Sequence, residues 1–223
     1  MHDIQPANTD TEVIRVDPTA PAPAALRRAA AVIATGRLVV FPTDTVYGIA
    51  CRPDDEKAID AVYEAKGRPR HLPLVLFVAS GQDLGRYAAA MTPELERAAR
   101  QFWPGPLTVV ARARPGVLPA LASRGAIGVR VPRHAVALRL VEACGGALAT
   151  TSANISGRGA TNDPQQALEQ LRGRIGLLLD AGRAPVGVES TVVDFTTQPP
   201  VVLRAGAIGI DELRAAIGRL SDA

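Results

Sequence analysis

The sequence predicts one α/β domain, and three observations favour this fold class. The chain has 223 residues, 47% of them hydrophobic, which suffices to bury one large core or two small ones; we favour one. Short apolar runs typical of buried strands alternate with segments whose apolar residues recur at helical spacing. Three stretches also change abruptly from apolar to polar residues, as strands of α/β proteins do where they reach a ligand site.

The first half of the chain contains clear start and stop signals for its elements. Gly36 stands where a helix C-cap is expected, and Gly67 and Pro69 both break a helix. Thr92 followed by Pro93 is a typical helix start. We expect a flexible tail over residues 1–12 and one domain over 13–220. The elements predicted in this half are an edge strand at 13–16, helices at 23–35, 55–66 and 92–102, and strands at 37–41, 73–79 and 107–111.

The second half continues the alternation and ends in a hairpin and a helix. Residues 115–123 are predicted to be a loop or a short helix, and 157–163 a flexible loop. A turn of Thr, Gln and Pro residues joins the two arms of the hairpin. The remaining predictions are strands at 126–131, 147–149, 175–179, 191–195 and 201–203, and helices at 132–144, 164–171 and 210–220.

Composition restricts the class of protein. No apolar run is long enough to cross a membrane and no signal peptide is recognisable, so we expect a cytoplasmic protein. Cys51 and Cys144 lie far apart without a CxxC motif, which predicts reduced, structural cysteines and no metal site in the protein. The formal net charge is only +3 and the arginines are scattered, which favours a pocket for an anionic ligand over a nucleic-acid-binding face.

Three polar stretches are expected to meet in one pocket. Thr43, Asp44 and Thr45 follow the strand that Pro42 ends; residues 152–157 follow the run at 147–149, and 189–191 follow Gly187 and Val188. The hydroxyls of the first stretch are either free for a ligand or simply cap the next turn. The sequence leaves both readings open.

Several cations stand beside turns and strand ends. Lys66 and Arg68 flank a glycine on a stiff turn, where they suit phosphate oxygens, although such pairs are more often solvated helix ends. Arg130 lies at the end of a buried strand and needs an anionic partner, either a protein carboxylate or a ligand. Arg204 follows the final hairpin. Trp103, next to Pro104, could stack on a base but more often such a residue fills the core.

The pocket offers hydroxyls, an amide and cations but no convincing base. His2, His71 and His134 lie in the tail, in a turn and at a helix start, which argues against a Ser-His-Asp mechanism. Neither a P-loop nor a dinucleotide fingerprint is present. Such a site suits phosphoryl or nucleotidyl transfer, in which the substrates supply the reactive groups and Mg²⁺ arrives with ATP, without a tightly bound organic cofactor.

Six motifs together resemble the YrdC family, and in order and spacing they cover about residues 13–218. They are F-P-T-D-T-V-Y-G at 41–48, K-G-R-P at 66–69, W-P-G-P-L-T at 103–108, V-R-V-P at 129–132, S-A-N-I-S-G at 152–157 and E-S-T-V-V-D at 189–194. The resemblance implies a single twisted mixed sheet, YrdC/RibB-like, flanked by helices around a basic cavity. It also implies a nucleotidyltransferase that converts L-threonine, bicarbonate and ATP to threonylcarbamoyl-AMP and pyrophosphate, for N6-threonylcarbamoyladenosine formation in tRNA.

The resemblance also implies roles for residues that match the family's motifs. Lys66 and Arg68 are similar to its catalytic K-x-R pair. The implied ATP-binding residues are Arg68, Ser152, Asn154 and Arg204. The implied threonine-binding residues are Thr45, Arg130, Thr150 and Ser190, with Arg130 on the threonine carboxylate.

Three departures from the family pattern, at Leu72, Phe77 and Ala160, keep a YciO-type paralogue open as an alternative. The chain resembles the short form of the family, which implies a downstream tRNA threonylcarbamoyl transferase complex as partner and no membrane. The alternative from another class is a non-catalytic module that binds tRNA or dsRNA. Aromatic residues, on which bases would stack, make up only 4% of the sequence, so the sequence supports this alternative weakly.

Overall fold

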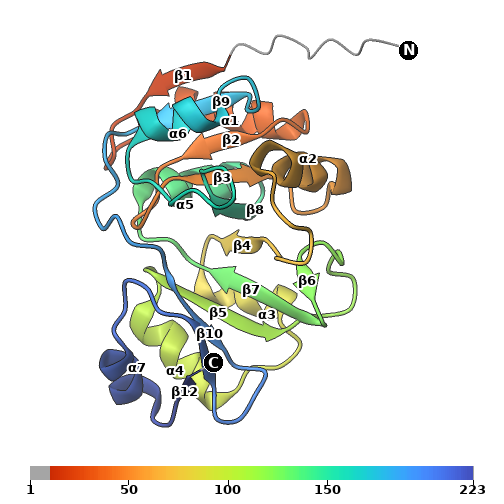
Figure 1. The fold of residues 1–223 in the computed structure, drawn as a ribbon, viewed down its shortest axis with the longest axis vertical. Coiled ribbons are helices and arrows are strands. Elements are labelled where there is room, and N and C mark those ends of the chain that lie inside the picture. Colours follow the sequence, from red (N-terminus) through yellow and green to blue (C-terminus); the bar gives the residue numbers. More distant parts are fainter. Residues whose placement is uncertain (1–10, 223) are drawn as a thin grey trace.

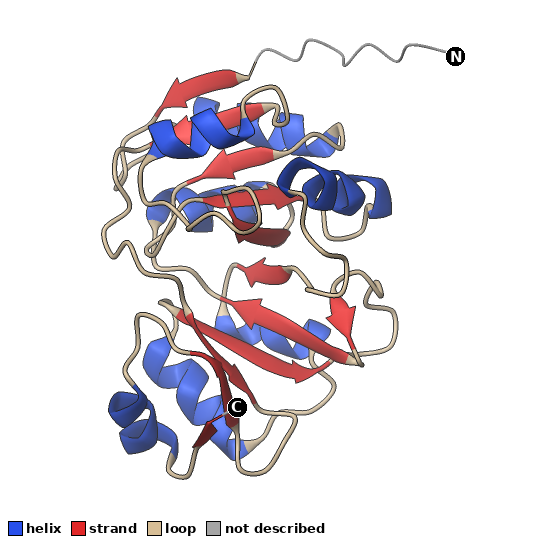
Figure 2. Cartoon of the chain, viewed as in Figure 1, coloured by secondary structure: helices blue, strands red, loops and turns tan. Residues whose placement is uncertain are grey.

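The computed structural model describes residues 11–222 and contains one mixed sheet of twelve strands (Figure 1). Eleven strands follow the order β1-β9-β2-β3-β8-β4-β7-β5-β10-β11-β12, and β6 pairs only with β7. The predicted single mixed sheet flanked by helices is confirmed (Figure 2). Most of the predicted tail lies outside the described residues, while β1 already includes Glu12.

The strands are β1 Glu12–Arg15, β2 Val39–Phe41, β3 Gly48–Cys51, β4 Val75–Val78, β5 Leu107–Arg112, β6 Ala122–Ser123, β7 Ala126–Arg130, β8 Ala147–Ser152, β9 Leu177–Asp180, β10 Thr191–Asp194, β11 Val201–Arg204 and β12 Ser221–Asp222. The helices are α1 Pro23–Ala34, α2 Glu56–Lys66, α3 Leu84–Tyr87, α4 Pro93–Phe102, α5 Ala135–Ala143, α6 Pro164–Leu171 and α7 Ile210–Ile217, with a 3₁₀ turn at Gly81–Asp83. None of the described helices is long and apolar enough to span a bilayer.

Two apolar clusters fill the two faces of the sheet. On one face α1 packs on α5, and both cover the side chains of β2, β8 and β9. The larger cluster includes buried residues of α2, α4, α6 and α7 on the other side. It runs without interruption from Leu38 to Ile217, so distant parts of the chain share one core.

Local signals in the sequence explain the helix that leads into the polar region. Asp55 accepts a hydrogen bond from the Ala58 amide at 3.1 Å and caps α2 at its start. Gly67 ends the helix with φ 60° and ψ 37°, the left-handed conformation that glycine adopts most easily. Lys66 and Arg68 therefore stand on either side of a fixed helix end.

The predicted polar strand ends need correction. β3 was not expected, and it forms a hairpin with β2, so residues 42–47 are the connection of that hairpin. β8 continues through its polar residues to Ser152, because they line a cavity while the strand keeps its ladder with β3 and β4. Gly187 and Val188 are not a strand, and Glu189 and Ser190 precede β10.

Candidate active site

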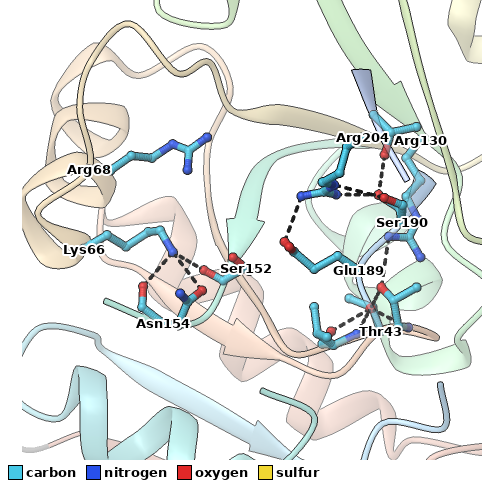
Figure 3. Close-up of polar contacts among 12 residues, drawn as sticks. Thr43, Lys66, Arg68, Arg130, Ser152, Asn154, Glu189, Ser190 and Arg204 are labelled. Atoms are coloured by element: carbon cyan, nitrogen blue, oxygen red, sulfur yellow. Dashed lines mark hydrogen bonds and ion pairs between the residues drawn. The ribbon is translucent and has the colours of Figure 1, made fainter. Parts of the chain in front are cut away.

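A cavity of about 110 Å³ lies over the central strands of the sheet, where the polar stretches meet. Its walls come from both halves of the chain, and Figure 3 shows Arg68 facing Arg204 and Glu189 from the opposite side. The lining residues are Thr43, Thr45, Val46, Tyr47, Gly48, Arg68, Pro73, Val75, Phe77, Thr108, Arg130, Thr150, Thr151, Ser152, Glu189, Ser190 and Arg204. A larger cavity of about 690 Å³ lies elsewhere, between the ends of α1 and α5 and the loop after β5. Its lining is both polar and apolar and contains no residue of the six motifs.

Arg130, at the end of β7, is 3% exposed and forms a buried ion pair. Its Nη2 donates to Asp44 Oδ1 at 2.8 Å, Nη1 donates to Thr45 Oγ1 at 3.1 Å, and Nε donates to the Gly105 carbonyl at 3.0 Å. Its guanidinium also lies over the Phe77 ring, 5.4 Å from the centroid. Burial lowers the pKa of Arg130, and Asp44 opposes this change. The anionic partner that the sequence required is thus a protein carboxylate, and two of five N–H donors remain for a ligand.

The threonine hydroxyls of the β2–β3 connection are not free. Thr43 Oγ1 donates to the Val46 carbonyl at 2.7 Å and accepts from the Thr45 amide at 3.0 Å, so this side chain orders the turn. Thr45 Oγ1 lies 3.0 Å from Thr43 Oγ1 and accepts from Arg130. The reading in which these residues cap the turn therefore holds for Thr43, while Thr45 faces the arginine.

Glu189, Ser190 and Arg204 form a second polar group. Arg204 donates to Glu189 Oε1 at 2.9 Å, to Ser190 Oγ at 3.0 Å and to the Ser190 carbonyl at 3.1 Å. Ser190 Oγ lies 2.8 Å from Thr108 Oγ1. A Cβ at Gly206 would approach the Glu189 carbonyl to 2.4 Å, so glycine is needed there to let this segment close on the hairpin.

Three consecutive residues at the end of β8 that carry hydroxyls also belong to the cavity lining. Thr150 is 1% exposed and its Oγ1 donates to the Val75 carbonyl at 3.0 Å. Thr151 and Ser152 are half-buried, and within residues 11–222 their hydroxyls have no hydrogen-bond partner in the protein. Neither hydroxyl is therefore committed to a partner within the described part of the protein.

Among the arginines that line the cavity, Arg68 is the one without a carboxylate partner in the described part of the protein. It donates to the carbonyls of Leu72 at 3.1 Å and Pro73 at 3.2 Å, and no carboxylate of the described residues forms an ion pair with it. Burial lowers its pKa. An anion in the cavity would supply the missing partner.

Lys66 and Asn154 lie beside the cavity but not in its lining. Lys66 Nζ donates to the carbonyls of Ser152 and Asn154, the latter at 2.6 Å, and to Asn154 Oδ1 at 3.3 Å (Figure 3). Asn154 Nδ2 donates to the carbonyls of Ile155 and Arg158. The pKa of Lys66 is lowered to about 7, mainly by burial and in part by the nearby Arg68 charge, while Glu189 opposes the change.

Seven of the predicted site residues therefore line one cavity, namely Thr45, Arg68, Arg130, Thr150, Ser152, Ser190 and Arg204. Sequence reasoning missed Asp44 as the partner of Arg130, Glu189 as the partner of Arg204, and Thr108. Glu189 and Asp44 stood inside recognised motifs, but no local pattern pairs them with arginines so distant in the chain. At two of the departures from the family pattern, Phe77 supports Arg130 and the Leu72 carbonyl holds Arg68.

The residues of the cavity offer little to a bound metal ion. No group of three or more His, Cys, Asp or Glu side chains that could hold a metal occurs within residues 11–222. Glu189 is the one carboxylate in the cavity lining, and it is paired with Arg204. This donor set fits a cation that arrives bound to phosphates and takes at most one ligand from the protein.

Comparisons with known proteins agree on one family. A family model for Sua5, YciO and YrdC proteins, described as "Telomere recombination", matches residues 31–206. Threonylcarbamoyl-AMP synthase of Pyrococcus abyssi is 41% identical over 197 residues, which are 87% of this chain and 58% of the relative. The Bacillus subtilis enzyme of that name is 34% identical over 195 residues, which are 86% of this chain and 56% of the relative. The chain thus spans less than two thirds of the length of these two relatives.

A shorter relative and two solved structures complete the comparison. A putative threonylcarbamoyl-AMP synthase of Mycobacterium leprae is 37% identical over 191 residues, 85% of this chain and 86% of the relative. The crystal structure of P. abyssi Sua5 complexed with L-threonine superposes with a TM-score of 0.92 at 38% identity, over 96% of this chain and 63% of that chain. The crystal structure of Escherichia coli YciO superposes with a TM-score of 0.84 at 24% identity, over 91% of this chain and 99% of that chain. At this identity the similarity shows a common fold alone.

Proposed function

Because the chain belongs to the Sua5, YciO and YrdC family, we propose that it is a threonylcarbamoyl-AMP synthase. The substrates in this proposal are L-threonine, bicarbonate and ATP, and the products are threonylcarbamoyl-AMP and pyrophosphate. One observation carries the proposal. Seven residues predicted to bind ligands line one cavity, in a chain 38% identical to a Sua5 that was crystallised with L-threonine.

This reaction requires little from the protein beyond the positioning of its substrates. The threonine amine attacks carbon dioxide derived from bicarbonate and loses a proton, which gives an N-carboxylate. An oxygen of this carbamate then attacks the α-phosphorus of ATP, the bond between α-phosphorus and bridging oxygen breaks, and pyrophosphate leaves. No protein nucleophile takes part, so fixed cations and hydroxyls that hold the reactants in line would supply most of the catalysis.

The two ends of the cavity suit different parts of the substrates. Arg130 retains two N–H donors beside Thr45, which suits the planar carboxylate of threonine, with Thr150 and Ser190 nearby. Arg68 lacks a carboxylate partner and stands across from Arg204, so these two cations suit the phosphates of ATP. Ser152 would add a free hydroxyl at the nucleotide end, and Asn154 would shape the loop that carries it.

Magnesium enters this proposal as part of the nucleotide substrate. Mg²⁺ binds nucleotides largely through phosphate oxygens and water and needs few ligands from a protein. Glu189, the carboxylate in the cavity lining, would be such a ligand, and it would then bind the ion and Arg204 together. When bound, the ion would neutralise phosphate charge.

The first test is pyrophosphate release from ATP with magnesium and bicarbonate, measured with and without L-threonine. We expect release that requires L-threonine, that L-serine supports poorly, and that yields an adenylated product by mass spectrometry. Nucleotide binding without threonine-dependent release would instead favour a YciO-type paralogue. RNA binding in the absence of ATP, weakened steeply by salt, would favour the RNA-binding module.

Two substitutions test the division of the cavity. Arg130→Ala should raise the Kd for L-threonine by about tenfold or more and change the Kd for ATP much less, because it removes a charge-assisted bond at one end. Arg68→Ala should do the reverse. Calorimetric titration of each ligand measures both effects, and equal losses for the two ligands would contradict the assignment.

The proposed product also implies a partner. Threonylcarbamoyl-AMP is a mixed anhydride and hydrolyses unless an enzyme accepts its acyl group. We propose a separate transferase that passes the threonylcarbamoyl group to adenosine in tRNA. Formation of modified adenosine on adding such a transferase and tRNA would test this step.

A further inference from the structure

We propose that Lys66 is a positioning residue, whose buried ammonium group holds residues 152–156 in the shape that binds the nucleotide, rather than a residue that binds phosphate itself. The identity of the nucleotide rests on the proposed function. The role of the lysine in ordering the segment does not depend on it.

The contacts of Lys66 all lead to this segment. The side chain is 1% exposed, and Nζ donates to the carbonyls of Ser152 and Asn154 and to Asn154 Oδ1. The Lys66 carbonyl accepts from the Ser156 amide at 2.8 Å. One residue at the end of α2 thus ties the segment at both its start and its end.

The number of donors and acceptors matches an ammonium group. An ammonium has three N–H donors, and three oxygen atoms surround this one, so no donor is left for a phosphate. No carboxylate of the described residues forms an ion pair with Lys66, so the oxygens of residues 152 and 154 are the direct partners that compensate its burial. These oxygens would in turn lose their partner if the ammonium were removed.

Arg68 provides the contrast that makes the role of Lys66 specific. Arg68 belongs to the cavity lining and Lys66 does not, although they are separated only by Gly67. Ser152, whose backbone carbonyl Lys66 holds, belongs to the cavity lining. Lys66 therefore acts on the ligand through Ser152 and its neighbours, whereas Arg68 can reach the ligand directly.

The first experiment measures order in the segment without any ligand. Amide hydrogen exchange in residues 153–158 should be about tenfold or more faster in Lys66→Met than in the wild type, because the lost side-chain bonds hold this backbone. Amides of α4 should exchange unchanged. Arg68→Met, the matched control, should leave the segment protected. Unchanged exchange of residues 153–158 in Lys66→Met would overturn the proposal.

The second experiment separates positioning from direct phosphate binding. Lys66→Met should raise the Kd values of AMP, ADP and ATP by the same factor, since the segment is disturbed regardless of phosphate number. For Arg68→Met the factor should grow from AMP to ATP. Adding Ser152→Ala to Lys66→Met should raise the Kd values little further. Adding it to Arg68→Met should raise them by the same factor as Ser152→Ala alone does. An effect of Lys66→Met that grows with phosphate number would overturn the proposal.

A second variant covers the case in which Lys66→Met does not fold. Lys66→Gln keeps N–H donors without the charge and should give intermediate exchange, with an equal factor for all three nucleotides. A factor that grows with phosphate number would again overturn the positioning role. Failure of the proposed function would look different, because the wild type would then show no threonine-dependent pyrophosphate release while the exchange result stood.

Discussion

The buried pair of Asp44 and Arg130 sets the electrostatics on one side of the cavity. The side chains are 5% and 4% exposed, and Asp44 Oδ1 also accepts from the Arg133 amide at 3.0 Å. Asp44 Oδ2 is buried without a hydrogen-bond partner among the described residues. The guanidinium is therefore held by a carboxylate of which one oxygen has two donors and the other has none in the described part of the protein.

Asp44→Asn should destabilise the protein by about 3 kcal/mol, because it leaves the Arg130 charge buried without a counter-charge. Urea denaturation measures the change. Glu142→Gln is the matched control, since Glu142 pairs with Arg139 on the surface and its loss should cost less than about 0.5 kcal/mol. Equal stability of the two variants would mean that the buried Arg130 does not need Asp44 as its counter-charge.

Lys66 should make the stability of the protein depend on pH. Its pKa is lowered to about 7 in the folded protein, mainly by burial, so the side chain is the three-donor ammonium group below that pH. Between that pH and the ordinary lysine pKa of 10.5 the unfolded chain binds more protons. The stability of the wild type relative to Lys66→Met should therefore rise as pH increases from 7 to 10, by at most ~1.4 kcal/mol per pH unit. Urea denaturation of both proteins at several pH values tests this. A difference that is constant with pH would show that the three oxygen acceptors keep the ammonium protonated.

At the level of secondary structure, the end of α2 is the element on which the nucleotide end of the cavity depends. Gly67 adopts φ 60°, and a Cβ added there would meet nothing within 4 Å, so substitution costs backbone strain alone. Gly145, after α5, has φ 88° and the same open surroundings. The two glycines differ in their neighbours, because Gly67 directly precedes Arg68 of the cavity lining, whereas Gly145 precedes Gly146.

Gly67→Ala and Gly145→Ala should each reduce stability by about 1 kcal/mol, since alanine resists the left-handed conformation. Only Gly67→Ala should also weaken ATP binding, because it shifts Arg68. Denaturation and calorimetric titration together separate the two effects. If both variants bound ATP as the wild type does, Arg68 would not need the fixed helix end.

The helices with capping signals could be predicted from the sequence, and several short strands could not. Asp55 and Thr92 cap α2 and α4 as their residue types suggest, because capping is a local interaction. β3 is short and begins with Gly48, and it is a strand only because β2 and β8 pair with it on either side. Gly187 and Val188 look like the end of a strand but find no partner strand.

At the scale of the whole molecule, the cavity draws its walls from the centre of one continuous sheet. β3, β8, β4, β7 and β5 are neighbours, and each contributes a lining residue. The larger apolar cluster, on one face of the sheet, extends past this region in both directions, from β2 to α7. Binding in the cavity should therefore stabilise the described domain as a unit.

ATP at about a hundredfold excess over its Kd should raise the free energy of unfolding by ~2.7 kcal/mol in a single transition. Differential scanning calorimetry measures both the size of the shift and the number of transitions. Arg68→Ala, at the same ATP concentration, should show a smaller shift. Two transitions, of which ATP moves only one, would contradict a single cooperative core.

The sequence by itself determined the alternation of helices and strands, most of the helix ends and seven of the residues that line the cavity. These features depend on local propensity, capping and motif spacing, which are set by neighbours in the chain. Only the tertiary structure decided how the charged groups are partnered: Asp44 holds Arg130, Glu189 holds Arg204, Lys66 holds the backbone of residues 152–154, and Arg68 remains open. The partners lie up to 88 residues apart in the sequence. Such pairs cannot be predicted from local sequence, because only folding brings the two groups within hydrogen-bond distance.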